Sequence, residues 1–298
     1  MEKVFLPSLL ISEIFYPVID KQGVTADIIE QLVEEEFYHS FEIVSGQNKS
    51  ERKKILELSE ENNLLITQWL TFSIEKNGYD IASYDTKLRE ESINYIKESI
   101  PLGAESGAEN IAFVPGSDPG SDFREESKKM FFEGLCEICE EAKKYNMNIL
   151  FEPLDRGVDK NRLIGPTSEA KKIINKVRTH FKNIGLAFDT AHAALNEENV
   201  KESIESIESE IYQIHFSNAV LDKGHEMFGD LHIPIGSPGF LNIKEIVTYL
   251  EKLKGIGIKA NKQIPIAIEA RSNKHDNLHM VEKKNRDLLN KAINLAID

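Results

Sequence analysis

Eight short apolar segments alternate with longer amphipathic stretches, and this alternation restricts the fold more than any other feature of the chain. Strands that alternate with helices form parallel sheets through right-handed crossovers, and eight such strands can close into a barrel. We therefore expect an α/β fold, a (β/α)8 TIM barrel. The expected strands are Val4–Leu6, Ser40–Val44, Leu64–Leu70, Asn110–Val114, Asn148–Glu152, Ile184–Asp189, Ile211–Phe216 and Ile264–Glu269.

The stretches between these segments carry helical signals. Between the fourth and fifth strands, apolar residues are spaced by 4, 3, 4 and 3 positions on one stripe: Phe131, Leu135, Ile138, Ala142 and Tyr145. A second helix is predicted to begin at residues 167–169 with a hydroxyl cap. The last helix of the chain is predicted to run from about Glu282 to Ile297. The segments after Phe216 and after Pro115 are rich in turn formers and fit no helix pattern.

The chain is expected to form one domain over residues 1–298. Barrels of alternating strands and helices reach 298 residues as single domains. Hydrophobic residues make up 41% of the sequence, which is enough for a large core, and no linker or repeat interrupts the alternation. Cys136 and Cys139 share a helical face and are interpreted as small buried residues.

The charge and hydropathy of the chain argue against two classes of partner. The formal net charge of −14 repels phosphate backbones and anionic membranes, so no nucleic-acid or membrane partner is expected. Pro7 and Glu13 interrupt the apolar N-terminal run, and no stretch approaches the roughly 20 apolar residues needed to span a bilayer. We expect a cytoplasmic protein, and a homo-oligomer is compatible with the fold.

Four consecutive expected strands end in a side chain that can bind a metal. These are Glu152 in ILFEP, Asp189 in GLAFDTAH, His215 in IYQIHF and Glu269 in PIAIEAR. Each alone could pair with a lysine or arginine, but neighbouring strand ends of a barrel converge at one mouth. A buried carboxylate costs several kcal/mol unless a cation compensates it. Three carboxylates and an imidazole predict one divalent ion, with Mn²⁺ preferred and Mg²⁺, Co²⁺ or Zn²⁺ as alternatives.

These motifs resemble the xylose isomerase-like TIM barrel superfamily, in particular the sugar phosphate isomerase/epimerase group that includes D-tagatose 3-epimerase-like proteins. The matching pieces are FEPLDR, FDTAH, IHFSN and AIEAR; residues 148–271 match well and the first half matches in outline. The resemblance implies that Glu152, Asp189, His215 and Glu269 bind the metal. It also implies that Glu152 and Glu269 are catalytic, transferring a proton on opposite faces of a carbohydrate or keto-acid substrate through a metal-stabilised enediolate.

Other side chains are candidates for substrate binding. In the family, the histidine that matches His192 contacts substrate hydroxyls, although a helix cap is the alternative. The family's arginine beyond the metal histidine is missing here, so Asp230 or His232 is expected to replace it, or to stabilise its loop. The remaining candidates are Arg156 and Arg271, for a carboxylate or phosphate or for the site's own carboxylates, and Trp69, for stacking on a sugar or for packing.

The sequence therefore predicts a metal-dependent sugar isomerase or epimerase, and three alternatives stay open. A dehydratase of the inosose or dehydroshikimate type would begin with the same proton abstraction. A nuclease resembling endonuclease IV would need more histidines and basic loops, which the net charge of −14 disfavours. A non-catalytic sugar sensor would not need two bases. Substitution of Glu152 or Glu269 by glutamine is expected to abolish turnover without unfolding the chain.

Overall fold

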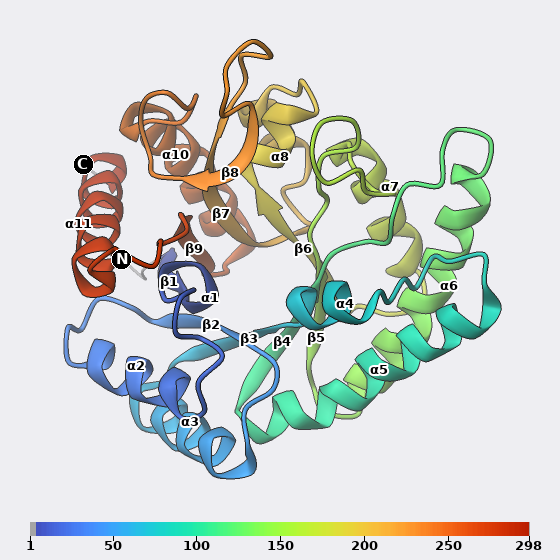
Figure 1. The fold of residues 1–298 in the computed structure, drawn as a ribbon, viewed down its shortest axis with the longest axis horizontal. Helices are drawn as coiled ribbons and strands as arrows, with labels where there is room; N and C mark the ends of the chain where they lie inside the picture. Colours follow the sequence, from blue (N-terminus) through green and yellow to red (C-terminus); the bar gives the residue numbers. More distant parts are fainter. Residues whose placement is uncertain (1–3, 298) are drawn as a thin grey trace.

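The computed structural model describes residues 4–297, in which eight parallel strands form a closed ring (Figure 1). Pairing follows the chain order from β1 to β7, then β7 pairs with β9 and β9 pairs with β1. The predicted (β/α)8 TIM barrel is thus confirmed. The ring consists of β1 (Phe5–Leu10), β2 (Ser40–Val44), β3 (Leu65–Trp69), β4 (Ala108–Phe113), β5 (Asn148–Phe151), β6 (Ile184–Asp189), β7 (Ile211–Val220) and β9 (Ile264–Glu269).

Helices surround the ring, and their apolar stripes pack against the outer faces of the strands (Figure 1). On α6, for example, Phe131 lies edge-on to Phe151 of β5, with 5.4 Å between ring centroids. The surrounding helices are α2 (Val24–Val33), α3 (Lys49–Asn62), α5 (Thr86–Glu105), α6 (Arg124–Lys143), α7 (Thr167–Val177), α9 (Val200–Ser206), α10 (Ile243–Ala260) and α11 (Leu278–Ile297). No helix in residues 4–297 is long and apolar enough to cross a membrane.

Three short helices directly follow strands at the carboxyl end of the ring. They are α1 (Ile11–Ile14) after β1, α4 (Thr71–Asn77) after β3 and α8 (Thr190–Leu195) after β6. The C-terminal face of such a barrel is where ligand-binding residues gather. Inside the ring, a small apolar cluster that includes Leu10, Trp69 and Leu150 lies beside buried polar side chains.

Several sequence-based boundaries are corrected by the structure. The first strand is Phe5–Leu10 rather than Val4–Leu6, and the last helix begins at Leu278 rather than about Glu282. Tyr145 lies beyond the end of α6 and is 41% exposed. Helix α7 does begin at Thr167, but its N-cap is Pro166 and no side chain caps it.

The long segment after Phe216 contains a strand that the sequence did not predict. Strand β7 continues to Val220, and β8 (Gly229–Ile233) pairs with it antiparallel outside the ring. The sequence signal is weak because β8 is short and its residue Leu231 is exposed. This hairpin brings Asp230 and His232 to the barrel mouth.

Candidate metal centre

The four strand-end side chains predicted as metal ligands meet at the carboxyl end of the barrel. One ligand atom from each of Glu152, Asp189, His215 and Glu269 lies within 4.8 Å of the others, and all four residues are buried. Glu152 is the first residue after β5, and the other three lie on β6, β7 and β9. Because these strands are neighbours in the ring, the two glutamates are the outer members of the set.

His215 lies at the centre of the cluster. Its Nδ1 is 3.0 Å from Oε2 of Glu269 and 3.6 Å from Oε1 of Glu152. Its Nε2 points the opposite way, 2.8 Å from Oε2 of Glu42 on β2. Burial opposes the charged imidazole, but the negative charge of Glu42 and the nearby carboxylates of Glu152 and Glu269 raise the pKa of His215 well above its usual range.

Asp189 shows that the cluster fits a cation. Its Oδ1 caps α8 by accepting from the backbone N–H groups of Ala191 (2.7 Å) and His192 (3.0 Å). Its Oδ2 is buried and makes no hydrogen bond to any residue between 4 and 297. Burial, together with nearby carboxylates, raises the pKa of Asp189 well above its ordinary value despite the charge of His192. Oxygen and imidazole ligands suit a divalent ion, which would compensate this carboxylate.

His232 on β8 borders the cluster. Its Nδ1 lies 2.8 Å from Oε1 of Glu269 and 3.3 Å from Oε2 of Glu13, and its backbone has φ of +51°. This left-handed conformation is uncommon for a residue with a side chain, and the Oδ1 atom of Asp230 accepts from the His232 backbone N–H at 3.3 Å. Although burial opposes it, the charge of Glu269 helps raise the pKa of His232 to about 9.

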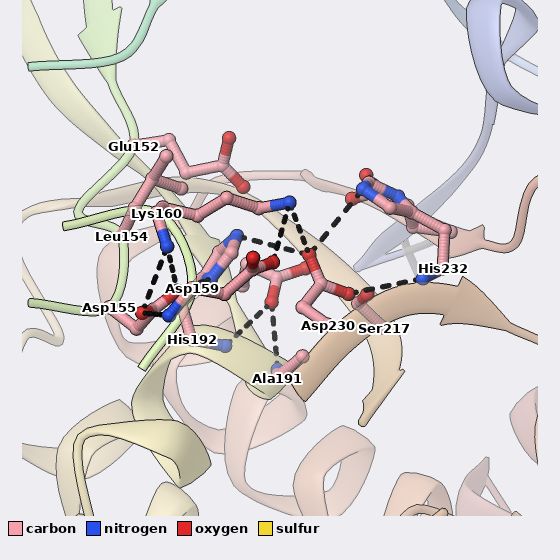
Figure 2. A network of polar contacts seen from close by, with 12 residues as sticks. Glu152, Leu154, Asp155, Asp159, Lys160, Ala191, His192, Ser217, Asp230 and His232 are labelled. Carbon is pink, nitrogen blue, oxygen red and sulfur yellow. Dashed lines mark hydrogen bonds and ion pairs between the residues drawn. The ribbon is translucent and has the colours of Figure 1, made fainter. Parts of the chain in front are cut away.

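A second cluster of polar residues lies next to the predicted metal ligands (Figure 2). Oδ2 of Asp230 is 3.7 Å from Nε2 of His192, 3.4 Å from Nε2 of His232 and 3.5 Å from Nζ of Lys160. Nδ1 of His192 lies 3.4 Å from Oδ2 of Asp155 on its other side. Asp155 also accepts hydrogen bonds from the backbone N–H groups of residues 158–160, and these bonds fix the loop that carries Lys160.

The cluster opens into a cavity of about 480 Å³. Glu152, His192, His215, His232 and Glu269 contribute to its polar side. The cavity therefore has room for a small polar molecule beside the predicted metal ligands. The apolar and aromatic residues that line the cavity are Leu10, Tyr16, Pro17, Ile19, Val44, Trp69, Phe72, Val114 and Leu154.

The remaining predicted substrate-binding residues are placed differently from one another. Arg271 lines the cavity, but its guanidinium forms two hydrogen bonds with Glu13, at 2.6 and 2.9 Å. Trp69 also lines it, and its indole N–H donates to Glu42 rather than to the cavity. Neither Asp230 nor Arg156 is among the cavity-lining residues. Asp230 contacts His192 and His232, and Arg156 pairs with Glu169 and the carbonyl of Leu163.

The sequence reasoning missed three residues of this region. Lys160 and Glu13 lie in segments with no recognisable pattern, so nothing in the sequence identified them. Glu42 gave a usable signal, because it is a carboxylate in the middle of the apolar strand SFEIV, and it is only 1% exposed. A charged residue at such a position requires a buried partner.

Comparison with known protein families shows that residues 31–270 match the family described as xylose isomerase-like TIM barrel. The chain belongs to this family. The match confirms the resemblance inferred from the strand-end motifs. No curated protein matches this xylose isomerase-like barrel in sequence.

Solved structures similar to this xylose isomerase-like barrel agree in fold. A D-psicose 3-epimerase from Clostridium cellulolyticum H10, solved with D-tagatose, superposes with a TM-score of 0.74 at 14% identity, covering 98% of this chain and 99% of that one. A D-tagatose 3-epimerase-like protein gives 0.66 at 22% identity, with 91% and 98% covered. An IolI protein with a bound zinc atom gives 0.67 at 17% identity, with 92% and 96% covered.

Proposed function

We propose that this protein is a divalent-metal-dependent isomerase or epimerase of a sugar, a sugar phosphate or a related keto acid. The observation that carries the proposal is the buried set of three carboxylates and one imidazole, of which Glu152, His215 and Glu269 line a cavity of about 480 Å³. The sugar epimerases and the zinc-containing IolI protein among the similar structures support this choice of substrate and metal.

The positions of Glu152 and Glu269 suit proton transfer on two faces of one substrate. When bound, a divalent cation would polarise a substrate carbonyl and thereby acidify the neighbouring C–H bond. Glu152 and Glu269 enter from β5 and β9, on either side of Asp189 and His215. One carboxylate can remove a proton from one face of a substrate carbon, and the other can return a proton to the opposite face, which inverts that carbon. Return to the adjacent carbon gives aldose–ketose isomerisation.

Side chains around the cavity supply donors for the rest of the substrate. His192, His232 and Lys160 line one side and can donate hydrogen bonds to hydroxyl groups. Arg271 lines the cavity with its charge already matched by Glu13, so a phosphate or carboxylate would have to share it. Trp69 offers an apolar surface next to the His215 ring, at 5.5 Å between centroids.

The proposal is tested by loading the protein with Mn²⁺, Mg²⁺, Co²⁺ or Zn²⁺ and incubating it with a panel of ketoses, sugar phosphates, inososes and keto acids. Formation of an epimer or isomer, identified by NMR, is the expected result. Glu152→Gln and Glu269→Gln should each abolish it, whereas Glu133→Gln, on the exposed face of α6, should not. A dehydrated product would instead establish the dehydratase alternative, and unchanged turnover in either active-site variant would refute the acid/base assignment.

A further inference from the structure

We propose that Glu42 is a positioning residue that fixes His215 with its proton on Nε2, so that Nδ1 presents its lone pair to the cation. The inference rests on the proposed function only in taking His215 as a metal ligand. Its basis is the hydrogen-bond network around the imidazole of His215, in which Glu42 and Gln213 are buried inside the barrel and are not among the cavity-lining residues.

Glu42 reaches His215 across the interior of the barrel. The glutamate is on β2 and the histidine on β7, and β1 and β9 separate these strands in the ring. The glutamate's Oε2 lies 2.8 Å from Nε2 of His215, and its side chain is 1% exposed. A carboxylate buried this deeply is stable only when its oxygens are paired, so the contact imposes a requirement on the facing nitrogen.

Every other partner of the Glu42 carboxylate is a donor. Oε2 accepts from the indole N–H of Trp69 at 2.7 Å and from the amide of Gln213 at 2.8 Å, and Oε1 accepts from Ser8 at 2.9 Å. Both carboxylate oxygens thus already accept hydrogen bonds, Oε2 from two donors and Oε1 from one. A carboxylate held in this way has only acceptor lone pairs to offer to His215.

A chain of side-chain hydrogen bonds fixes the orientation of the Gln213 amide. Asn148 donates to Asn110 at 3.0 Å, Asn110 donates to Thr67 at 3.1 Å, and the Thr67 hydroxyl donates to Oε1 of Gln213 at 3.2 Å. Because this chain uses the carbonyl oxygen of Gln213, its NH2 group faces Glu42, to which it donates at 2.8 Å, while the same nitrogen lies 3.2 Å from Nε2 of His215. The amide cannot rotate to offer its oxygen to His215 without breaking the chain.

These constraints leave Nε2 of His215 as a donor. A lone pair on Nε2 would face the lone pairs of a carboxylate oxygen at 2.8 Å, which is repulsive, whereas an Nε2–H donates a hydrogen bond to that oxygen. The other ring nitrogen, Nδ1, then faces Glu269 and Glu152. A carboxylate that accepts from a metal-binding histidine in this way orients the ring and increases its basicity as a ligand.

Trp69 supports the same geometry from a second side. Its N–H binds the oxygen of Glu42 that faces His215, while its ring lies 5.5 Å from the imidazole at an interplanar angle of 41°. The indole therefore holds both the carboxylate and the ring. This arrangement predicts that Trp69→Phe, which keeps the packing and removes the donor, weakens metal binding less than the loss of Glu42 does.

The first test is Zn²⁺ or Co²⁺ affinity, measured by competition with a chelator, together with the Co²⁺ absorption spectrum. Glu42→Gln should weaken binding roughly 10–100-fold and change the spectrum, because glutamine cannot accept from all four donors. Glu51→Gln is the matched control: Glu51 is a buried carboxylate that accepts backbone N–H groups of residues 23 and 25 at the start of α2. It should lower stability and leave metal affinity unchanged.

The second test needs no variant and so does not depend on how well Glu42→Gln folds. In ¹⁵N-histidine NMR of the Zn²⁺-loaded protein, Nε2 of His215 should carry the proton and Nδ1 should bind the metal. The opposite pattern, or unchanged affinity in a folded Glu42→Gln, would overturn the inference. If the inference is overturned in either way but the protein still converts a sugar, the proposed function stands. If Nε2 of His215 carries the proton as expected but no sugar is converted, only the proposed function is rejected. Failure to bind any divalent ion would reject both.

Discussion

Asp189 divides its two carboxylate oxygens between the fold and the site. Oδ1 caps α8, while Oδ2 faces the other predicted ligands and has no hydrogen-bond partner among residues 4–297. The same pattern occurs at Glu42, which accepts from Ser8 through one oxygen and from His215 through the other. At the scale of single residues, the positions of the predicted metal ligands are therefore set by hydrogen bonds on the side away from the cavity.

This division predicts different effects for two substitutions of Asp189. Asp189→Asn keeps an oxygen for the cap and removes the charge, so metal binding should be lost with little change in stability. Asp189→Ala should lose metal binding and an additional ~1 kcal/mol of unfolding free energy from the missing cap. Urea unfolding of the metal-free variants measures the difference, and equal stability of the two would contradict the capping role.

The Asp155–His192 pair predicts a dependence of stability on pH. Burial opposes ionisation of Asp155, but the contact with His192 and the bonds from backbone N–H groups lower the pKa of Asp155 to about 2. Burial also opposes the charge on His192, but Asp155 and the other nearby carboxylates raise the pKa of His192 to about 10. The contribution of Asp155 to the unfolding free energy is present above about pH 4 and is lost as the pH falls toward 2. The contribution of His192 to the unfolding free energy is complete below about pH 6.5 and is lost as the pH rises through 10.

Unfolding free energies of the metal-free protein and of Asp155→Asn, measured from pH 2 to pH 10, check this expectation. The difference between the two proteins should be largest from about pH 4 to pH 6.5 and should shrink toward both extremes. Asp122→Asn, at an exposed loop position, serves as the control. A difference that stays constant over the whole range would rule out the pair as its source.

The sequence identified the residues of the site that local pattern can reveal. Glu152, Asp189, His215 and Glu269 each lie at or next to the end of a strand expected from the sequence, and the barrel brings the four side chains together. Glu42 acts on His215 across the closed ring, a relation that no single segment contains. Arg156 was a candidate for a substrate carboxylate or phosphate or for the site's own carboxylates, whereas in the structure it pairs with Glu169 on α7.

At the scale of elements, the β7–β8 hairpin is held by Asn218. Its amide donates to the carbonyls of Pro234 (2.7 Å) and Gly236 (2.8 Å), and its oxygen accepts from the N–H of Leu241 (2.8 Å). A side chain at Gly239 would collide with this amide, since an added Cβ would lie 2.1 Å from Oδ1. The backbone pairing between β7 and β8 has a shifted register, and the side-chain bonds of Asn218 supplement it. Strand periodicity therefore could not predict β8.

Asn218→Ala should therefore loosen the hairpin that carries His232. Leaving buried backbone groups without partners costs about 1–3 kcal/mol of unfolding free energy. Limited proteolysis should cut the segment 221–240 faster than in the unaltered protein, and KM should rise more than kcat falls. Thr248→Ala, on the exposed side of α10, removes one side-chain hydrogen bond as a control. Unchanged proteolysis in Asn218→Ala would refute this account of the loop.

At the scale of the whole molecule, the closed ring predicts that residues 1–298 unfold as one unit. Strand β9 pairs with β1, so the two ends of the sheet depend on each other. Phe131→Ala, in the layer between α6 and β5, should lower the unfolding free energy by about 3–5 kcal/mol. Circular dichroism and the fluorescence of Trp69, the only tryptophan in the sequence, should show coincident transitions in both proteins. Separate transitions would indicate more than one folding unit.

The alternation of strands and helices predicted the closed barrel because each element carries its own periodicity. Strand ends shifted by a few residues, since the sequence does not mark where pairing stops. The hairpin at the mouth and the polar network inside the ring are products of closure, and they are the parts in which this chain adapts a common scaffold to its own site.

The central claim is that the four-ligand cluster and its two glutamates exchange a proton next to a substrate carbonyl. The most direct measurement is deuterium incorporation at that carbon, followed by NMR in D2O with metal-loaded and metal-stripped protein on the same panel of ketoses, inososes and keto acids. We predict exchange that requires the metal and is lost in both Glu152→Gln and Glu269→Gln. Equal exchange in the metal-stripped protein, or none with any compound when the metal is bound, would contradict the claim.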